Sequence, residues 1–219
     1  MEVIFEYLKA IGAHNNREWF WAHRAAFDEA MEHFVKLTEA LIVEVAKFDP
    51  RVAGIEVKNC LYRFARDTRF SPDKSPYKRH FGAYINPKGK KSMHGGYYLH
   101  LEPGGSLLAG GEIFLEPQVL RAIRQKVVDF PKEFLSIVEN DEFKKYFPQI
   151  GMSRLKTFPT GFPRDFAYPE LIRPKDFSVS LNLPDEFFFR KEWMNETVHI
   201  FKVMMPFLDF ANEVIDDYE

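Results

Sequence analysis

The residues best suited to binding chemistry lie in one basic segment, between positions 58 and 101. It contains ten Lys and Arg side chains, and its only acids are Asp67 and Asp73, so its net charge is +8. An arginine guanidinium presents a planar fork that matches a carboxylate or phosphate, while a lysine adds a mobile point charge. Two acids cannot neutralise ten bases locally, so the segment predicts a site for an anion.

The centre of this segment, residues 66–78, has the sequence RDTRFSPDKSPYK. Its two Ser-Pro steps place Ser71 and Ser75 in extended backbone and fix φ at the prolines that follow. Asp73, between these steps, favours an Asx turn. We therefore expect a stiff, non-helical loop that carries cations. A preordered loop loses less entropy when it binds an anion.

The leading hypothesis is recognition of a small phosphorylated or carboxylated ligand by this loop. The predicted ligand-binding residues are Arg66, Arg69, Lys74 and Lys78, with Arg17 near a helix N-terminus as a further contributor. If the protein is an enzyme, these cations would stabilise developing negative charge. The candidates for proton transfer are then Asp67, Asp73 and His100. The sequence leaves open whether the protein is an enzyme.

Three alternatives to a small-ligand site stay open. In the first, the loop neutralises itself, with Asp67 bound to a neighbouring arginine and Asp73 to Lys74 or Lys78, or the acidic residues of 209–219 cover it. In the second, the basic segment binds nucleic acid, and its aromatic side chains stack on bases. The candidate stacking residues are Tyr77, Tyr84, Tyr97 and Tyr98. In the third, the chain is a structural or partner-binding module whose basic face meets an acidic protein.

The other reactive residue types form no recognisable motif. No pair among His80, His94 and His100 has metal-ligand spacing along the chain, and Cys60 is the only cysteine, so we expect no zinc site. No Gly-x-Ser-x-Gly elbow is present for serine catalysis. The sequence predicts no metal and no cofactor.

The order of hydrophobic patterns predicts a single α+β domain over residues 1–219, with helices packed on a mostly antiparallel sheet. An N-terminal helix is expected over 16–48, capped by Asn15 with Glu18. A basic, strand-rich region should follow over 55–115, and a helical region over 116–219. The expected strands are Leu61–Ala65, His80–Ile85, Tyr97–Leu101, Ser106–Phe114 and one near 177–181. Further helices are expected from Pro117, from Pro131, near 168–172 and over 191–218, the last kinked at Pro206.

Overall composition sets outer limits on function. The 219 residues carry a net charge of −2, which excludes a uniformly basic surface and implies that residues outside the basic segment sum to −10. A single cysteine cannot form an internal disulfide. The N-terminal residues lack the pattern of a secretory signal, and no stretch is apolar enough to span a membrane. These features predict a cytoplasmic protein that does not act at a membrane, and they leave its oligomeric state undetermined.

Several of these motifs together resemble a known family. They are the Asn15–Phe20 segment, the Arg66–Lys78 motif, Tyr97–His100 with the glycine turn at 103–105, Gly110-Gly111, and the helix with Leu120 and Arg124. In these motifs the chain resembles domain of unknown function 2461, a family of conserved hypothetical proteins found mainly in bacteria and fungi. The resemblance implies membership and transfers no activity. It weakens at Thr157, where the family has arginine, and at Phe166-Ala167, where it has His-Pro.

Overall fold

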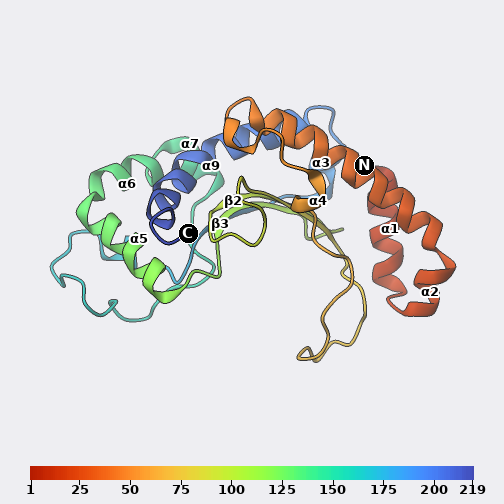
Figure 1. Cartoon of the computed structure of the whole chain (residues 1–219), viewed down its shortest axis with the longest axis horizontal. Helices are drawn as coiled ribbons and strands as arrows, with labels where there is room; N and C mark the ends of the chain where they lie inside the picture. The colour runs from red at the N-terminus through yellow and green to blue at the C-terminus, as the bar shows by residue number, and fades with distance from the viewer.

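A four-stranded antiparallel sheet lies at the centre of the molecule, with helices packed on one of its faces (Figure 1). The computed structural model describes all 219 residues. The strands are neighbours in chain order: β1 (Phe81–Ile85), β2 (Gly96–Leu101), β3 (Leu107–Glu112) and β4 (Phe177–Asn182). The predicted α+β class is confirmed.

The helices fall into two groups, one before β1 and one after β3, with β4 inside the second. The first group is α1 (Glu2–Ala13), α2 (Arg17–Ala22), α3 (Arg24–Ala46) and the short α4 (Val57–Cys60). The second is α5 (Pro117–Asp129), α6 (Pro131–Val138), α7 (Asp141–Tyr146), α8 (Asp185–Phe189) and α9 (Trp193–Ile215). Two 3-10 turns, Pro50–Val52 and Pro169–Ile172, complete the structure. None of the helices combines the length and apolar character needed to cross a lipid bilayer.

The two faces of the sheet differ because side chains alternate along each strand. On the covered face, apolar residues of β1–β4 pack under α3 and α9, whose own apolar residues recur every three or four positions. One continuous hydrophobic core results, from Ile4 in α1 to Ile215 in α9. A Cβ on Gly110 would collide with Met204 of α9, which shows how closely the helix approaches β3. The opposite face of the sheet carries no helix (Figure 1).

The prediction of one continuous N-terminal helix over 16–48 is wrong. The chain forms α2 and α3 instead, separated at His23, whose φ of −114° and ψ of 26° are not helical. The Trp19 ring stacks on the His23 ring at 4.1 Å. A one-residue break hardly disturbs a hydrophobic period of three to four, so the pattern did not reveal it. The cap is Asn16, whose side chain accepts the Trp19 N–H at 2.9 Å, and not Asn15.

The expected strand Leu61–Ala65 is also wrong. It forms only two isolated bridges, Leu61 with Ala83 and Ala65 with Tyr77, because the chain leaves the sheet there to begin a projecting loop. The sequence did not predict helices α1, α4, α7 and α8. By contrast, the structure confirms α5, α6, the 3-10 turn near 168–172, β4 and a long last helix, which continues through Pro206.

Candidate functional site

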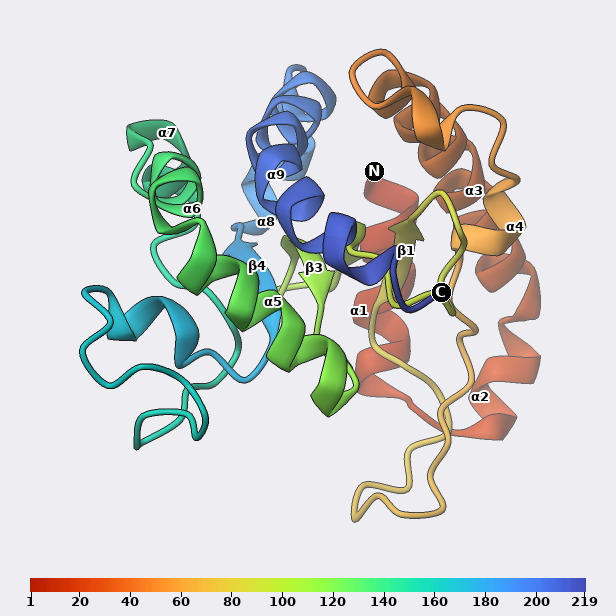
Figure 2. The ribbon, with the colours of Figure 1, turned by 60° about the vertical axis from the view of Figure 1, so that its left-hand side comes forward.

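The segment predicted to bind an anion forms a loop that projects beyond the edge of the sheet (Figures 1 and 2). Its stem is held by two backbone hydrogen bonds, Arg66 N–H to Pro76 O at 2.9 Å and Lys78 N–H to Phe64 O at 3.0 Å. Asn15 anchors the stem by bonding both the N–H and the carbonyl of Tyr77, at 3.1 and 2.8 Å. The loop is therefore fixed at its base, as expected for a preordered segment.

Arg66 organises the interior of this loop. Its guanidinium donates to the Asp73 carboxylate at 2.5 Å, to the hydroxyl and carbonyl of Ser75, and to the Ser71 hydroxyl. Asp73 also accepts the Ser75 N–H at 2.9 Å, so the predicted Asx turn is confirmed. The cation that pairs with Asp73 is Arg66, however, and not Lys74 or Lys78 as the self-neutralised loop would have it. These contacts use most of the donors of Arg66 within the loop.

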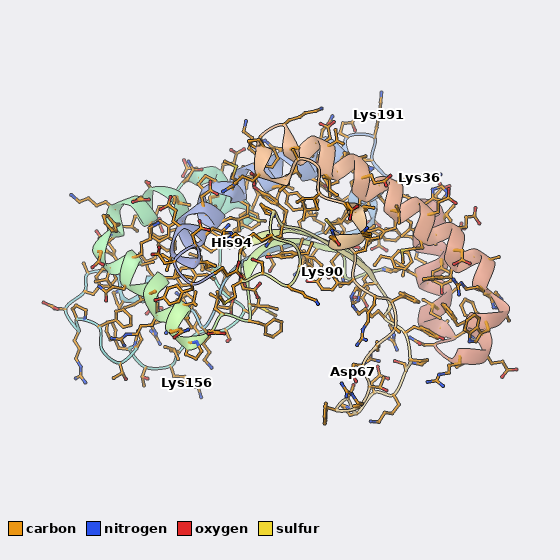
Figure 3. All side chains as sticks on the ribbon, in the orientation of Figure 1. Lys36, Asp67, Lys90, His94, Lys156 and Lys191 are labelled. Carbon is orange, nitrogen blue, oxygen red and sulfur yellow. The ribbon has the colours of Figure 1, made fainter.

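The two loop carboxylates, candidates for proton transfer, are exposed and already bonded. Asp67 accepts from Arg69 at 2.7 Å, and this hydrogen bond lowers the pKa of Asp67. Hydrogen bonds from the Ser75 backbone and hydroxyl, then from Arg66, lower the pKa of Asp73 to about 2. A carboxylate with a depressed pKa is a weak proton acceptor at neutral pH. Figure 3 shows Asp67 on the projecting loop, away from the sheet.

The structure does not gather the predicted binding residues in one place. Lys74 donates to the Thr68 carbonyl at 2.9 Å within the loop. Arg17 begins α2 and is exposed. Of the predicted set, only Lys78 lines a large cleft, so a single pocket formed by all five cations is not observed. The predicted set stays a prediction, with Lys78 as the one member that faces a cavity.

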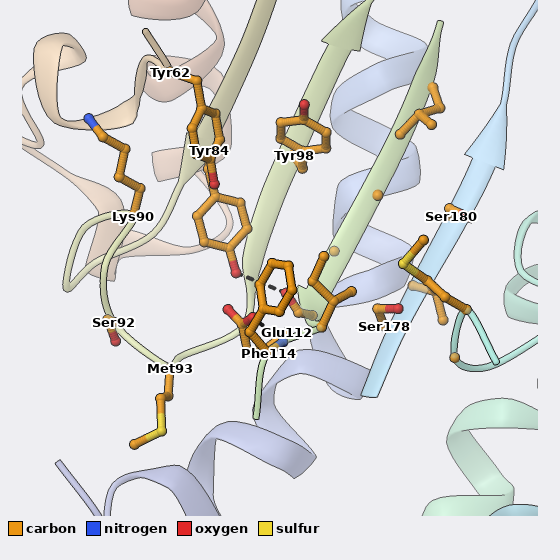
Figure 4. A pocket seen from close by; sticks show the side chains of 18 of the residues that line it. Tyr62, Tyr84, Lys90, Ser92, Met93, Tyr98, Glu112, Phe114, Ser178 and Ser180 are labelled. Carbon is orange, nitrogen blue, oxygen red and sulfur yellow. Dashed lines mark hydrogen bonds between the residues drawn. The ribbon is translucent and has the colours of Figure 1, made fainter. Parts of the chain in front are cut away.

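The cleft lies on the sheet face that carries no helix, and has a volume of about 910 Å³. Tyr84 and Tyr98 stand opposite each other in the register of β1 and β2, with Ala109 and Ser180 continuing the same row across β3 and β4. Figure 4 shows Tyr62, Tyr84 and Tyr98 on this floor, with Phe114 at one side. Gly82 makes room for the Tyr98 ring, since a Cβ there would lie 2.7 Å from its hydroxyl oxygen. The volume is in the range typical of small-molecule sites.

The predicted stacking tyrosines do not act together. Tyr84 and Tyr98 line the cleft, but Tyr97 points to the helical face, where its hydroxyl donates to Asp49 at 2.9 Å. Tyr77 stacks on Phe20 at 4.2 Å beside the loop stem. The set is divided because successive residues of a strand face opposite sides. Tyr62, which sequence reasoning missed, completes the aromatic floor, with its ring edge-on to Tyr98 at 6.0 Å.

Positive charge in the cleft comes from Lys78, Lys90 and Lys91. The Lys78 ammonium lies 5.2 Å from the centre of the Tyr62 ring, and burial lowers the pKa of Lys78, with a smaller effect from Arg63. Lys90 reaches the backbone carbonyls of Lys58 and Asn59 at 3.3 Å and lies close to the sheet (Figure 3). No carboxylate pairs with any of these three lysines. The one acid in the lining is Glu112, and burial raises the pKa of this carboxyl.

A second group of reactive side chains begins where the cleft ends, at Tyr98. The Tyr98 hydroxyl lies 2.9 Å from His100 Nδ1, and His100 Nε2 lies 3.0 Å from a Glu102 oxygen. The His80 ring packs on His100 with 4.1 Å between ring centres. Burial lowers the pKa of His100, although Glu102 opposes this, so the imidazole is held neutral. The hydroxyl–imidazole–carboxylate row can orient a proton and pass it along.

Of the predicted proton-transfer candidates, therefore, only His100 belongs to such a row. The sequence held a signal for the partners of His100: Tyr98, His100 and Glu102 are two positions apart, in β2 and one residue beyond its end, which places them on one face. His80, one residue before β1, joins them because Gly82 pairs with His100 in the β1–β2 register. Sequence spacing alone missed this cluster.

The acidic C-terminal residues cover a different part of the basic segment from the one considered in the sequence. Asp216 pairs with Lys88 at 3.0 Å, and Glu219 accepts from Ser92 Oγ at 2.7 Å and from the Met93 N–H. Figure 2 shows the C-terminal end of the chain beside the loop that connects β1 and β2. The Arg66–Lys78 loop is left uncovered by these acids.

The geometry defines an α+β protein with an open-faced sheet and an aromatic, lysine-lined cleft. The family model described as conserved hypothetical protein (DUF2461) matches residues 3–210, and the chain belongs to that family. The comparisons with curated proteins and with solved structures give no match.

Proposed function

We propose that the protein binds a small anionic molecule with a planar ring in the cleft on the open face of the sheet. One observation carries this proposal: the cleft combines an aromatic floor with three lysines that no carboxylate neutralises. The ligand class is a phosphorylated or carboxylated small molecule. Its ring would lie against Tyr62 and Tyr98, and its anionic group would meet Lys78, Lys90 and Lys91.

The ligand class is the one expected from the sequence, but the proposed binding residues are those of the cleft and not those of the projecting loop. The loop arginines are poor candidates for an external anion, because Arg66 and Arg69 already donate to Asp73 and Asp67. An incoming phosphate would have to displace those carboxylates. The cleft lysines have no carboxylate competitor, and an anion would replace only the two long carbonyl contacts of Lys90. Tyr98 and His100 supply a proton relay at the edge of the same cleft, should the bound molecule react.

The test is a thermal-shift and calorimetric titration in buffer with EDTA. The probes are nucleoside monophosphates, pyridoxal phosphate and aromatic carboxylates, with inorganic phosphate and uncharged nucleosides as partial ligands. A ligand that binds only the folded state raises Tm in proportion to its concentration over Kd. We expect a rise with at least one complete probe and a smaller rise with its two parts.

The variant Lys90→Ala/Lys91→Ala should weaken binding of that probe at least tenfold. Its matched control is Arg69→Ala/Lys74→Ala, which removes the same charge from the projecting loop and should leave Kd within twofold. The proposal is overturned if no probe raises Tm. It is also overturned if the loop variant loses binding while the cleft variant keeps it, a result that would return the site to the loop.

Nucleic acid binding stays the second prediction, and the same protein tests it. Affinity for a single-stranded oligonucleotide should fall steeply between 50 and 200 mM salt if several phosphates are neutralised, by about three hundredfold for six contacts. A small ligand with one anionic group should show a far shallower dependence. Tight, strongly salt-dependent oligonucleotide binding with no small-molecule binding would favour the nucleic acid alternative.

A further inference from the structure

A cluster of three metal-ligating side chains lies beside the cleft, outside the lining residues proposed to bind the anion. It consists of His80, which precedes β1, and His100 and Glu102 at the end of β2. One ligand atom from each lies within 4.8 Å of the other two. All three side chains are partly buried, so the cluster is neither a solvated surface group nor sealed in the core.

Hydrogen bonding within the protein does not account for this convergence. His100 Nε2 lies 3.0 Å from the Glu102 oxygen, but His80 Nδ1 is 3.9 Å from that oxygen, too far for a hydrogen bond. His80 makes no hydrogen bond through either ring nitrogen, although its ring is stacked on His100. Packing alone does not explain why a nitrogen of this partly buried imidazole faces both a carboxylate and a second imidazole.

The spacing fits a tetrahedral ion. Two ligand atoms bound to zinc at about 2.0–2.1 Å and at a tetrahedral angle lie about 3.3 Å apart. The separations of 3.0 Å and 3.9 Å to the Glu102 oxygen fall on either side of this value, and all three ligand atoms lie within 4.8 Å of one another, so the three side chains lie close to a ligating arrangement.

The neighbouring tyrosine can set the state of His100 that a metal needs. A ligating histidine usually donates its second ring N–H to an oxygen, which fixes the tautomer and the orientation of the ring. The Tyr98 hydroxyl lies 2.9 Å from His100 Nδ1 and can act as donor or acceptor. With the proton on Nδ1 and donated to Tyr98, the Nε2 lone pair would be free to bind an ion between His100 and Glu102.

We propose that His80, His100 and Glu102 bind a divalent transition metal ion, and that the ion is zinc. Two imidazoles and one carboxylate form the ligand set of catalytic zinc sites, which keep a fourth position for water or substrate. Tyr98 contacts the site and lines the cleft, so that position adjoins the ligand cavity. The positive charge of Lys78, which is close by, would repel the ion, and the negative charge of Glu102 would attract it.

The experiment is titration of EDTA-treated, dialysed protein with Zn²⁺ by calorimetry and with Co²⁺ by visible absorption. We expect one ion per chain, with Kd in the micromolar range or below, and the intense visible bands of tetrahedral cobalt. His80→Gln and Glu102→Gln should each weaken binding at least thirtyfold, and Tyr98→Phe should weaken it about tenfold. Circular dichroism and urea unfolding check that each variant is folded.

The matched control is His199→Gln. His199 forms an exposed pair with Glu142 at 2.6 Å, a histidine and a carboxylate without a third ligand. It should leave Kd unchanged. If a cluster variant does not fold, X-ray absorption of zinc-loaded wild-type protein decides, and two imidazoles with oxygen ligands are expected. The proposal is overturned by the absence of stoichiometric binding, by a different ligand set, or by full binding in the folded cluster variants.

This site does not depend on the anion proposal. The anion titrations are done with EDTA and the metal titrations without phosphate, so either can fail alone.

Discussion

At the scale of single residues, His80 is a strongly perturbed group outside the hydrophobic core. Burial, then the neighbouring His100 and Lys78, lowers the pKa of His80 from 6.5 to about 3. Glu102, 3.9 Å away, faces the same ring and does not offset these effects. The folded protein therefore holds His80 neutral across a range in which the unfolded chain would bind a proton.

We predict that this residue makes stability depend on pH. Between about pH 6.5 and 3 the unfolded state binds more protons at this position than the folded state, so the free energy of unfolding falls as the pH is lowered. The free-energy cost of keeping His80 unprotonated in the folded state is absent above pH 6.5 and grows until the pH reaches about 3. His80→Gln should remove about 1–2 kcal/mol of the decrease between pH 7 and pH 5.

Urea unfolding of metal-free protein at several pH values in this window measures the effect. The pKa of Asp73 falls from 3.8 to about 2, so its loss lies below about pH 5, and the comparison between pH 7 and pH 5 avoids it. The matched control is His33→Gln, on the exposed side of α3, which should keep the wild-type slope. A slope unchanged by His80→Gln would show that His80 is not held neutral in the folded protein.

At the scale of elements, close approaches of backbone fix the sheet that carries the cleft. Gly111 in β3 has φ of +94°, and a Cβ there would collide with the Phe177 carbonyl of β4. Gly104, in the turn between β2 and β3, has a similar φ of +73° but no atom within 4 Å of its Cβ position. The two glycines share a backbone conformation and differ in their surroundings.

This difference predicts unequal costs for the same substitution. Gly104→Ala should lower the free energy of unfolding by about 1–2 kcal/mol, the cost of a left-handed alanine. Gly111→Ala adds a steric collision that the β3–β4 pair must relieve, so we expect a loss of more than about 3 kcal/mol. Chemical unfolding of both variants gives the comparison. Equal losses would mean that the β3–β4 pair accommodates a methyl group at little cost.

The elements also show what the sequence could predict. Apolar periodicity and proline positions identified α5, α6, β4 and the last helix, because these depend on local pattern. Tertiary contacts decide where α2 breaks at His23 and where Leu61–Ala65 leaves the sheet. One such contact is the hydrogen bond from Asn15 to Tyr77, 62 residues away. For the site, residue type located the basic loop and His100. Residue type could not show that the loop pairs its own charges, or that the ring of His80, just before β1, packs on His100 of β2.

At the scale of the whole molecule, the two ends of the basic segment are held differently. The Arg66–Lys78 loop is anchored from the N-terminal helices through Asn15. The loop over 86–95 is anchored from α9, where the buried Asn212 bonds both the N–H and the carbonyl of Gly95 at 2.7 and 3.0 Å. The acidic C-terminal residues add to this second anchor. Cations at both ends of the segment are therefore paired with carboxylates, while the three lysines of the cleft have no carboxylate partner.

We predict that the C-terminal acids order the loop that carries Lys90 and Lys91. Asp216 lies 3.0 Å from both Lys88 Nζ and His94 Nε2, and Glu219 binds Ser92 and Met93. Asp216 and Lys88 are largely exposed, so their ion pair contributes at most about 1 kcal/mol to global stability, and the other contacts join the 86–95 loop to the end of the chain. Asp216→Asn/Glu219→Gln should therefore change the free energy of unfolding little, while amides in residues 86–95 exchange with deuterium at least several times faster.

The matched control is Asp217→Asn, an exposed neighbour with no ion pair, which should leave exchange in that loop unchanged. The same double variant should also weaken binding of any anionic probe found for the cleft, because a mobile loop must be ordered again on binding. Unchanged exchange in 86–95 would mean that Asn212 alone fixes the loop. The acidic C-terminus would then serve only to neutralise Lys88, and the lysines of the cleft would owe their position to α9.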